Sequence, residues 1–126
     1  MTAVPDGCVG FVYRIRNVHS GRQYIGRKNF WRRVTKPPLK GQRRKRRVTV
    51  ESDWRNYFGS CDELKADMTW LGSGAFIRTI ERLCRTKAEL TYAELEFQVK
   101  EDVLTRKLAG GEFAFYNRNI MNRFFR

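Results

Sequence analysis

The stretch GFVYRIRNVHSGRQYIG, residues 10–26, decides the fold. In its first half Phe11, Tyr13 and Ile15 alternate with valine and arginine, a period of two that is typical of a β-strand with one buried face. The letters NVHSG supply turn-forming residues that end at Gly21, and RQYIG then returns as a second strand. We therefore predict a β-hairpin that carries tyrosines on two neighbouring strands.

The segment after this hairpin is strongly basic. We expect Gly26 to let the backbone bend sharply, and we expect RKNFWRR, residues 27–33, to start a helix. Pro37 and Pro38 interrupt regular structure beyond it. We predict a mobile basic loop at about residues 32–50, with or without a short ribbon at its edges.

Composition indicates one domain, residues 1–126, with a polyanionic partner. The chain has 126 residues, of which 41% are hydrophobic, and its formal net charge is +13. Because such charge opposes compaction, it is better explained by binding to nucleic acid than by the needs of a fold. No apolar run reaches membrane-spanning length and no secretion signal is evident, so we expect no membrane partner. Three cysteines and one histidine favour reduced thiols in a cytoplasm over a disulfide framework or a Cys/His metal cluster.

Capping and breaking residues mark further elements. Ser52 or Asp53 caps a short helix, and a Thr-x-x-Glu capping box at Thr86 begins a long helix that Gly110 and Gly111 stop. The expected elements are helices at about 52–59, 62–71 and 86–108, strands at 75–84 and 113–117, and a C-terminal helix at 118–126.

The long helix has two apolar strips and a carboxylate beside one of them. The strips are Ala88, Tyr92, Leu95, Val99 and Val103, and Leu90, Ala93, Phe97 and Leu104. Because a helix that is apolar on two sides is mostly buried, we expect this one to pack on the sheet. Glu94 borders the second strip, so we do not interpret it as an ordinary surface charge.

These features together resemble the GIY-YIG nuclease family. Its two phrases correspond to GFVY, ending at Tyr13, and YIG, starting at Tyr24, and a later helix carries one acidic residue, Glu94. A terminal Tyr116-Asn117 pair resembles the end of the family's domain. YIGRKNFW, the basic insert and SDWRNYFGS further resemble small free-standing homing-type endonucleases of bacteriophages.

The resemblance implies an α/β (α+β) domain in which helices flank a small three-stranded antiparallel sheet. It also implies hydrolysis of DNA phosphodiesters with one divalent metal, Mg²⁺ or Mn²⁺. Glu94 is then the metal ligand, with Glu96 as the alternative, Tyr13 and Tyr24 line the side of water attack, and Asn117 orients the site. Mg²⁺ keeps several waters and needs few carboxylates, and a nearby cation is expected to lower a tyrosine pKa from about 10.

The phosphate-stabilising arginine departs from the family pattern. Simple members place it ten positions after the second tyrosine, where this chain has Val34. We expect the basic insert to displace that helix to SDWRNYFGS, so Arg55 and Tyr57 are candidates and Lys28 is an alternative. Such an arginine contributes several kcal/mol of transition-state stabilisation, roughly.

The basic insert is interpreted as a phosphate-binding segment, with backbone contact favoured over base readout. Its expected DNA-binding residues are Arg32, Arg33, Lys36, Lys40, Arg43, Arg44, Lys45, Arg46 and Arg47. The favoured function is a metal-dependent DNA endonuclease of homing or phage DNA-processing type, located in the host cytoplasm if phage-encoded. The alternative is a non-catalytic basic protein that binds nucleic acid on the same scaffold.

Overall fold

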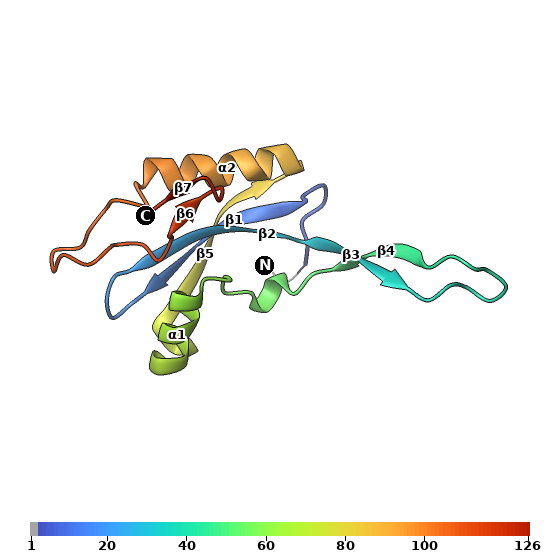
Figure 1. The fold of residues 1–126 in the computed structure, drawn as a ribbon, viewed down its shortest axis with the longest axis horizontal. Helices are drawn as coiled ribbons and strands as arrows, with labels where there is room; N and C mark the ends of the chain where they lie inside the picture. The colour runs from blue at the N-terminus through green and yellow to red at the C-terminus, as the bar shows by residue number, and fades with distance from the viewer. Residues whose placement is uncertain (1–2) are drawn as a thin grey trace.

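The computed structural model describes residues 3–126 and is built on a three-stranded antiparallel sheet (Figure 1). The central strand β1 (Gly10–Asn17) pairs with β2 (Gln23–Asn29) on one side and with β5 (Phe76–Cys84) on the other. The predicted hairpin and the predicted third strand are both confirmed. The α/β fold class, with helices flanking a three-stranded antiparallel sheet, is confirmed with them.

The alternation along β1 divides the core between the two faces of the sheet. Phe11 and Tyr13 pack on one face with Trp54 and Leu64, which belong to the segments after the basic insert. Val12 packs on the opposite face in a second cluster of buried residues. The two helices therefore cover opposite faces: α1 (Asp62–Leu71) one, and α2 (Lys87–Lys100) the other (Figure 1).

The expected bend at Gly26 and the expected helix at 27–33 are wrong. Strand β2 runs straight through Gly26 to Asn29, and β3 (Trp31–Lys36) starts two residues later. Gly26 stays extended because it lies opposite Tyr13 in the β1–β2 ladder.

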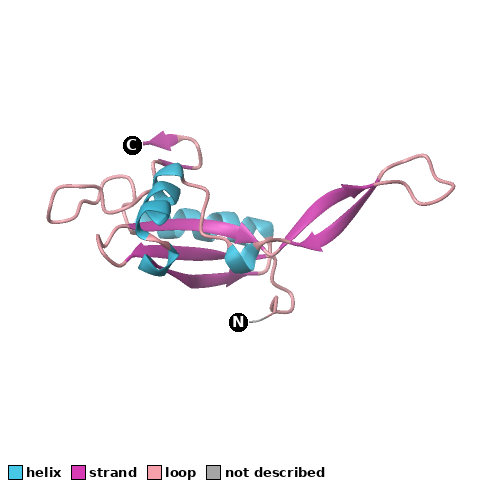
Figure 2. Ribbon diagram, turned by 90° about the horizontal axis from the view of Figure 1, so that it is seen from below, coloured by secondary structure: helices cyan, strands magenta, loops and turns pink. Residues whose placement is uncertain are grey.

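The basic insert is mainly a two-stranded ribbon. Strand β3 pairs with β4 (Arg46–Glu51), with Val34 opposite Val48, and the ribbon projects from the body of the molecule (Figures 1 and 2). Paired β-branched side chains of this kind stabilise antiparallel strands. The loop expected at about 32–50 is thus confined to residues 37–45.

The predicted helix at 62–71 is confirmed as α1, whereas the expected short helix at 52–59 is only a 3₁₀ turn, η1 (Trp54–Asn56). A second 3₁₀ turn, η2 (Ser73–Ala75), leads into β5. Helix α2 begins at the predicted cap, where the backbone N–H of Glu89 donates to Thr86 Oγ1 at 3.0 Å.

Helix α2 is shorter and less buried than expected. It ends at Lys100 instead of near 108, and Asp102 has left-handed backbone geometry with φ 51°. Leu90 and Ala93 pack on the sheet, but Tyr92 and Val99 are 65% and 56% exposed. The expectation of two buried strips is wrong, because only one side of the helix meets the sheet.

The C-terminal segment forms a hairpin where we expected a helix. Strands β6 (Asn119–Ile120) and β7 (Phe124–Phe125) pair across a turn in which Met121 and Asn122 have φ of 56° and 52°. The strand expected at 113–117 is limited to two isolated bridges, a parallel one between Phe115 and Gln23 and an antiparallel one between Phe113 and Lys107. In the part of the chain that the structure describes, residues 3–126, the helices are too short or too polar to cross a membrane.

Candidate active site

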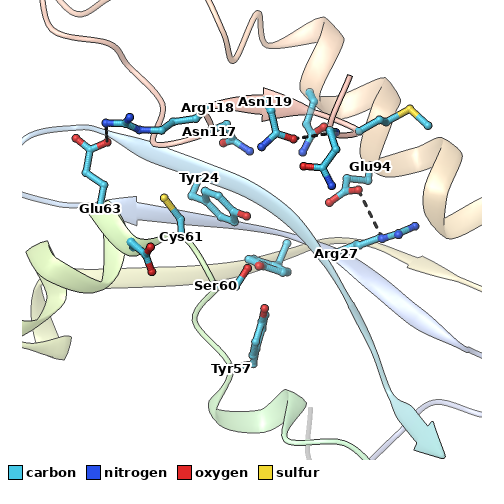
Figure 3. A pocket seen from close by; sticks show the side chains of 15 residues that line it. Tyr24, Arg27, Tyr57, Ser60, Cys61, Glu63, Glu94, Asn117, Arg118 and Asn119 are labelled. Atoms are coloured by element: carbon cyan, nitrogen blue, oxygen red, sulfur yellow. Dashed lines mark hydrogen bonds and ion pairs between the residues drawn. The ribbon is translucent and has the colours of Figure 1, made fainter. Parts of the chain in front are cut away.

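A cleft of about 710 Å³ opens beside the outer edge of β2 (Figure 3). Four parts of the molecule line it: the sheet, the segment 57–63, helix α2, and the residues after Tyr116. Five of the residues that the sequence predicts as catalytic line it. They are Tyr13, Tyr24, Tyr57, Glu94 and Asn117.

Gly26 explains how the two tyrosines fit together. Tyr13 lies opposite Gly26 in the ladder, and Tyr24 is two residues from Gly26, so all three share one face of the sheet. The ring centroids of the two tyrosines are 6.2 Å apart. A Cβ on Gly26 would lie 2.5 Å from Tyr13 Oη and 2.9 Å from Tyr24 Cε2. The glycine of the YIG phrase therefore provides the space that both phenols occupy.

Tyr57 completes the aromatic wall of the cleft. Its ring meets Tyr13 edge-on with centroids 5.9 Å apart. Gly59 turns the following chain with φ 87°, a conformation that glycine adopts without strain. Lys28 lies behind Tyr57, with Nζ 4.0 Å from the ring centroid and 2.7 Å from an Asp53 carboxylate oxygen. Lys28 is thus close to the cleft without being one of its lining residues.

Glu94 reaches the cleft from α2 and faces Arg27 (Figure 3). Its side chain is 21% exposed, and its Oε1 lies 3.6 Å from Arg27 Nε. Burial raises the pKa of the Glu94 carboxyl above its usual range, although the positive charge of Arg27 opposes this. The alternative ligand Glu96 is not among the residues that line the cleft, and its carboxylate lies 3.8 Å from Arg82 of β5.

The surroundings of the tyrosines favour their protonated form. Burial raises the pKa of Tyr24 to about 12, and the negative charge of Glu94 acts in the same direction. Burial also raises the pKa of Tyr13, to well above its usual range. The lowering expected from the sequence is therefore not produced by the protein's own groups, and only an added cation would supply it.

Asn117 is bound to the backbone of β2. Its Oδ1 accepts from the N–H of Ile25 at 3.0 Å, and its Nδ2 donates to the Ile25 carbonyl at 2.8 Å. Gln98 of α2 also donates to that carbonyl, at 3.1 Å. Asn117 is 4% exposed, so its position beside the cleft follows from holding the edge of β2.

Sequence analysis missed the charged cleft residues Asp62 and Glu63, and also Arg27, which faces Glu94. Arg27 lines the cleft, directly after the YIG phrase. The period-two pattern places position 27 on the face opposite Gly26, the face that α2 covers. This alternation would have indicated Arg27 only if β2 had been predicted to continue through Gly26. Arg118, Asn119, Met121 and Asn122 of the C-terminal segment also line the cleft and were not predicted.

The remaining candidates lie elsewhere. Arg55 is on η1, paired with Glu51 and stacked 4.7 Å from the ring centroid of Trp54, and it is not among the residues that line the cleft. The predicted DNA-binding residues are on the projecting β3–β4 ribbon and its loop (Figure 2). They are not among the residues that line the cleft.

The paired tyrosines, the partly buried glutamate and the small antiparallel sheet are the arrangement that the resemblance to the GIY-YIG family implied. A family model described as "Putative endonuclease segE, GIY-YIG domain" matches residues 1–120, and the chain belongs to the GIY-YIG endonuclease family. No curated protein and no solved structure matches the chain.

Proposed function

We propose that this protein is a metal-dependent endonuclease that hydrolyses DNA phosphodiester bonds. The observation that carries the proposal is the meeting of Tyr13, Tyr24, Arg27 and Glu94 in one cleft, although Glu94 is far from the tyrosines in sequence. Membership of a nuclease family supports the reaction class. The polyanionic substrate agrees with the net charge of +13.

The donor set of the cleft fits a hard divalent cation such as Mg²⁺ or Mn²⁺. Among residues 3–126 no three His, Cys, Asp or Glu side chains gather into a possible metal cluster. Mg²⁺ is commonly held by one or two carboxylates, with waters and substrate phosphate oxygens completing its shell. Glu94 would be the protein ligand, and the bound cation would neutralise charge on the phosphate and make a bound water more acidic.

The chain's own groups have distinct tasks in this scheme. The Arg27 guanidinium, now paired with Glu94 at 3.6 Å, is placed to bind a phosphate oxygen that enters between them. The phenols of Tyr24 and Tyr13 are held protonated by burial, so they orient the attacking water by hydrogen bonding. Either phenol becomes a proton acceptor only when a cation lowers its pKa.

The ribbon supplies affinity for the DNA backbone. A two-stranded β-ribbon has the width that the major groove admits, and its positive charges are suited to the flanking phosphates. Its strands and loop carry the nine basic residues predicted to bind DNA, at positions 32–47. Because the ribbon projects from the body, it extends the contact beyond the cleft (Figure 2).

One observation favours the alternative of a non-catalytic nucleic-acid binder. Arg55, the arginine that the family resemblance favoured, lies on η1 and not among the residues lining the cleft. If Arg27 does not take its place, the scaffold binds DNA without cutting it.

Cleavage of supercoiled plasmid with Mg²⁺ or with EDTA separates the two functions. We expect nicking with Mg²⁺ only, and Glu94→Gln should slow it by at least about 100-fold. Glu96→Gln is the matched control, because Glu96 is on the same helix but pairs with Arg82 outside the cleft. A salt-sensitive gel shift without nicking would support the alternative. Equal rates for Glu94→Gln and Glu96→Gln would exclude Glu94 as the ligand.

We further propose a homing or phage DNA-processing role, with the host cytoplasm as the location if the protein is phage-encoded. The similarity of YIGRKNFW and SDWRNYFGS to such enzymes supports this proposal. Cleavage ends mapped on a long natural DNA would test it, since a homing enzyme cuts at few sites and a degrading enzyme cuts at many.

A further inference from the structure

The C-terminal hairpin exposes two phenylalanine rings. Phe124 is 59% exposed and Phe125 is 68% exposed, and Met121 at the turn between the strands is 57% exposed. Exposed apolar side chains that cluster on a surface often mark an interaction site. The match to the family model ends at residue 120, so the family assignment does not account for them.

These rings are held on an anchored structure. The N–H of Arg126 donates to the Arg118 carbonyl at 2.8 Å, which closes the hairpin at its base. The Arg126 guanidinium donates to the Phe115 carbonyl at 2.7 Å and stacks 4.1 Å from the Phe113 ring centroid. Ile120 is 8% exposed and belongs to the core beneath α2. The two exposed rings are therefore carried by a hairpin that is fixed to the body of the molecule.

The hairpin forms part of the rim of the cleft. Met121 and Asn122, at its turn, both line the cleft. Phe125 lies directly opposite Asn119, another lining residue, and opposed residues of an antiparallel pair share one face. Phe125 is thus on the face of the hairpin that meets the cleft, whereas Phe124 lies opposite Ile120 on the other face, so the two rings flank the hairpin on both sides.

The charge around the rings selects nucleic acid over a second copy of the chain. Arg123 is exposed, and the Arg118 side chain is 69% exposed. A second copy would bring another chain of net charge +13 to these arginines, whereas DNA brings phosphates to the arginines and base surfaces to the rings.

We propose that the β6–β7 hairpin is a wedge whose Phe124 and Phe125 rings unstack DNA bases beside the phosphate held in the cleft. This inference rests on the proposed function, because it assigns the DNA a position in that site. Apolar wedges inserted at a base step unstack it and kink the duplex, at a cost of a few kcal/mol, roughly, per step. The enzyme should therefore act best on DNA whose bases are already unstacked.

The test compares an intact 40-base-pair duplex with the same duplex carrying a central three-base mismatched bubble. The variant is Phe124→Ala/Phe125→Ala, and the control is Tyr92→Ala, an aromatic of similar exposure, 65%, on α2. In single-turnover cleavage with Mg²⁺, we expect the double variant to lose about 10- to 100-fold on the intact duplex. On the bubble, where no unstacking is needed, we expect a loss below about 3-fold.

Binding in EDTA gives a readout that does not depend on cleavage. The double variant should lose affinity for the intact duplex by at least about 10-fold while keeping its affinity for the bubble. If the wild type cuts neither DNA, but the double variant loses affinity for the intact duplex and not for the bubble, the proposed nuclease function fails and the wedge stands. Equal losses on both DNAs, no loss on either, an equal loss in Tyr92→Ala, or a dimer that the double variant abolishes would each overturn the wedge.

Discussion

The side chain of Asn117 takes the place of a neighbouring strand for Ile25, accepting from its N–H at 3.0 Å and donating to its carbonyl at 2.8 Å. Strand β2 is at the edge of the sheet, so these backbone groups have no partner strand on that side. The bonds fix the segment that carries Tyr24 and Gly26. We therefore expect Asn117 to act on the cleft by positioning its wall.

Asn117→Asp tests this positioning role. The substitution replaces a donor by a second carboxylate oxygen facing the Ile25 carbonyl, which keeps its bond from Gln98, and a buried polar atom left unpaired costs about 1–3 kcal/mol. We expect urea unfolding at pH 7 to show a loss of that size. Asn119→Asp is the control, because Asn119 also lines the cleft but uses its side-chain oxygen to accept from Asn122 N–H, which an aspartate retains. Full stability with lost cleavage in Asn117→Asp would instead indicate a direct catalytic role.

Gly26→Ala should disrupt the tyrosine pair. The new Cβ would lie 2.5 Å from Tyr13 Oη, so the Tyr13 ring must shift at a cost of about 1–3 kcal/mol. Urea unfolding measures the loss, and near-ultraviolet circular dichroism reports the changed tyrosine environment. Gly74→Ala is the control, since a Cβ there meets no atom within 4 Å.

Adding Tyr13→Phe to Gly26→Ala gives a stricter version of that test. Removing the hydroxyl takes away the atom nearest to the new Cβ, so part of the lost stability should return in the double variant. Simple additivity of the two single losses would contradict the close packing described here.

The two pocket-lining glutamates should affect stability with opposite signs. Burial raises the pKa of Glu94, so its contribution to stability is lost as the pH rises from its ordinary pKa, about 4.3, through the folded value. Glu94→Gln should therefore be more stable than the wild type at pH 7, with a difference that shrinks toward pH 4.

Glu63 provides the contrast within the same measurement. The Arg22 guanidinium, 3.0 Å away, lowers the pKa of Glu63, so its contribution is present above its ordinary pKa and lost as the pH falls through the folded value. Glu63→Gln should be less stable than the wild type at pH 7, with a difference that shrinks in acid. Urea unfolding across pH 3–7 measures both, and the same sign for the two variants would refute the burial of Glu94.

The basic ribbon should set the salt dependence of DNA binding. Each phosphate contact contributes about 0.9 to the slope of log K against log salt. We expect replacement of four ribbon cations by glutamine to reduce this slope by up to four times about 0.9, as measured by fluorescence anisotropy. The four are Arg43, Arg44, Lys45 and Arg46. The control neutralises four exposed cations near α2, which should leave the slope nearly unchanged. They are Arg85, Lys87, Lys100 and Arg106.

Local patterns in the sequence predicted much of this fold, and long-range packing decided the rest. The hairpin and the Thr86 cap were predicted correctly because alternation and capping act within a few residues. The prediction of a bend at Gly26 was wrong. Gly26 leaves room for Tyr13, a residue of the neighbouring strand, so its role depends on strand pairing and not on local sequence. Arg27 was missed as a consequence.

The site showed the same division. The resemblance to the family identified Tyr13, Tyr24 and Glu94 as candidate site residues, and the structure places all three in one cleft. The direction of the tyrosine pKa shifts was predicted wrongly, because the prediction considered a nearby cation and left out the burial of the phenol rings. A helix was predicted where the C-terminal hairpin forms, because RNIMNRFFR lacks a period of two and only Asn122 of the left-handed pair Met121 and Asn122 is a typical turn residue.

A double-mutant cycle on the rate of DNA cleavage tests the central claim most directly. The enzymes are the wild type, Tyr24→Phe, Glu94→Gln and the double variant, each measured in single turnover with saturating Mg²⁺. If the phenol and the carboxylate act on one phosphate, the double variant should be no more than about 3-fold slower than the slower single variant, because groups that act as a unit are not additive. Losses that multiply, or a wild-type rate in either single variant, would contradict a shared site.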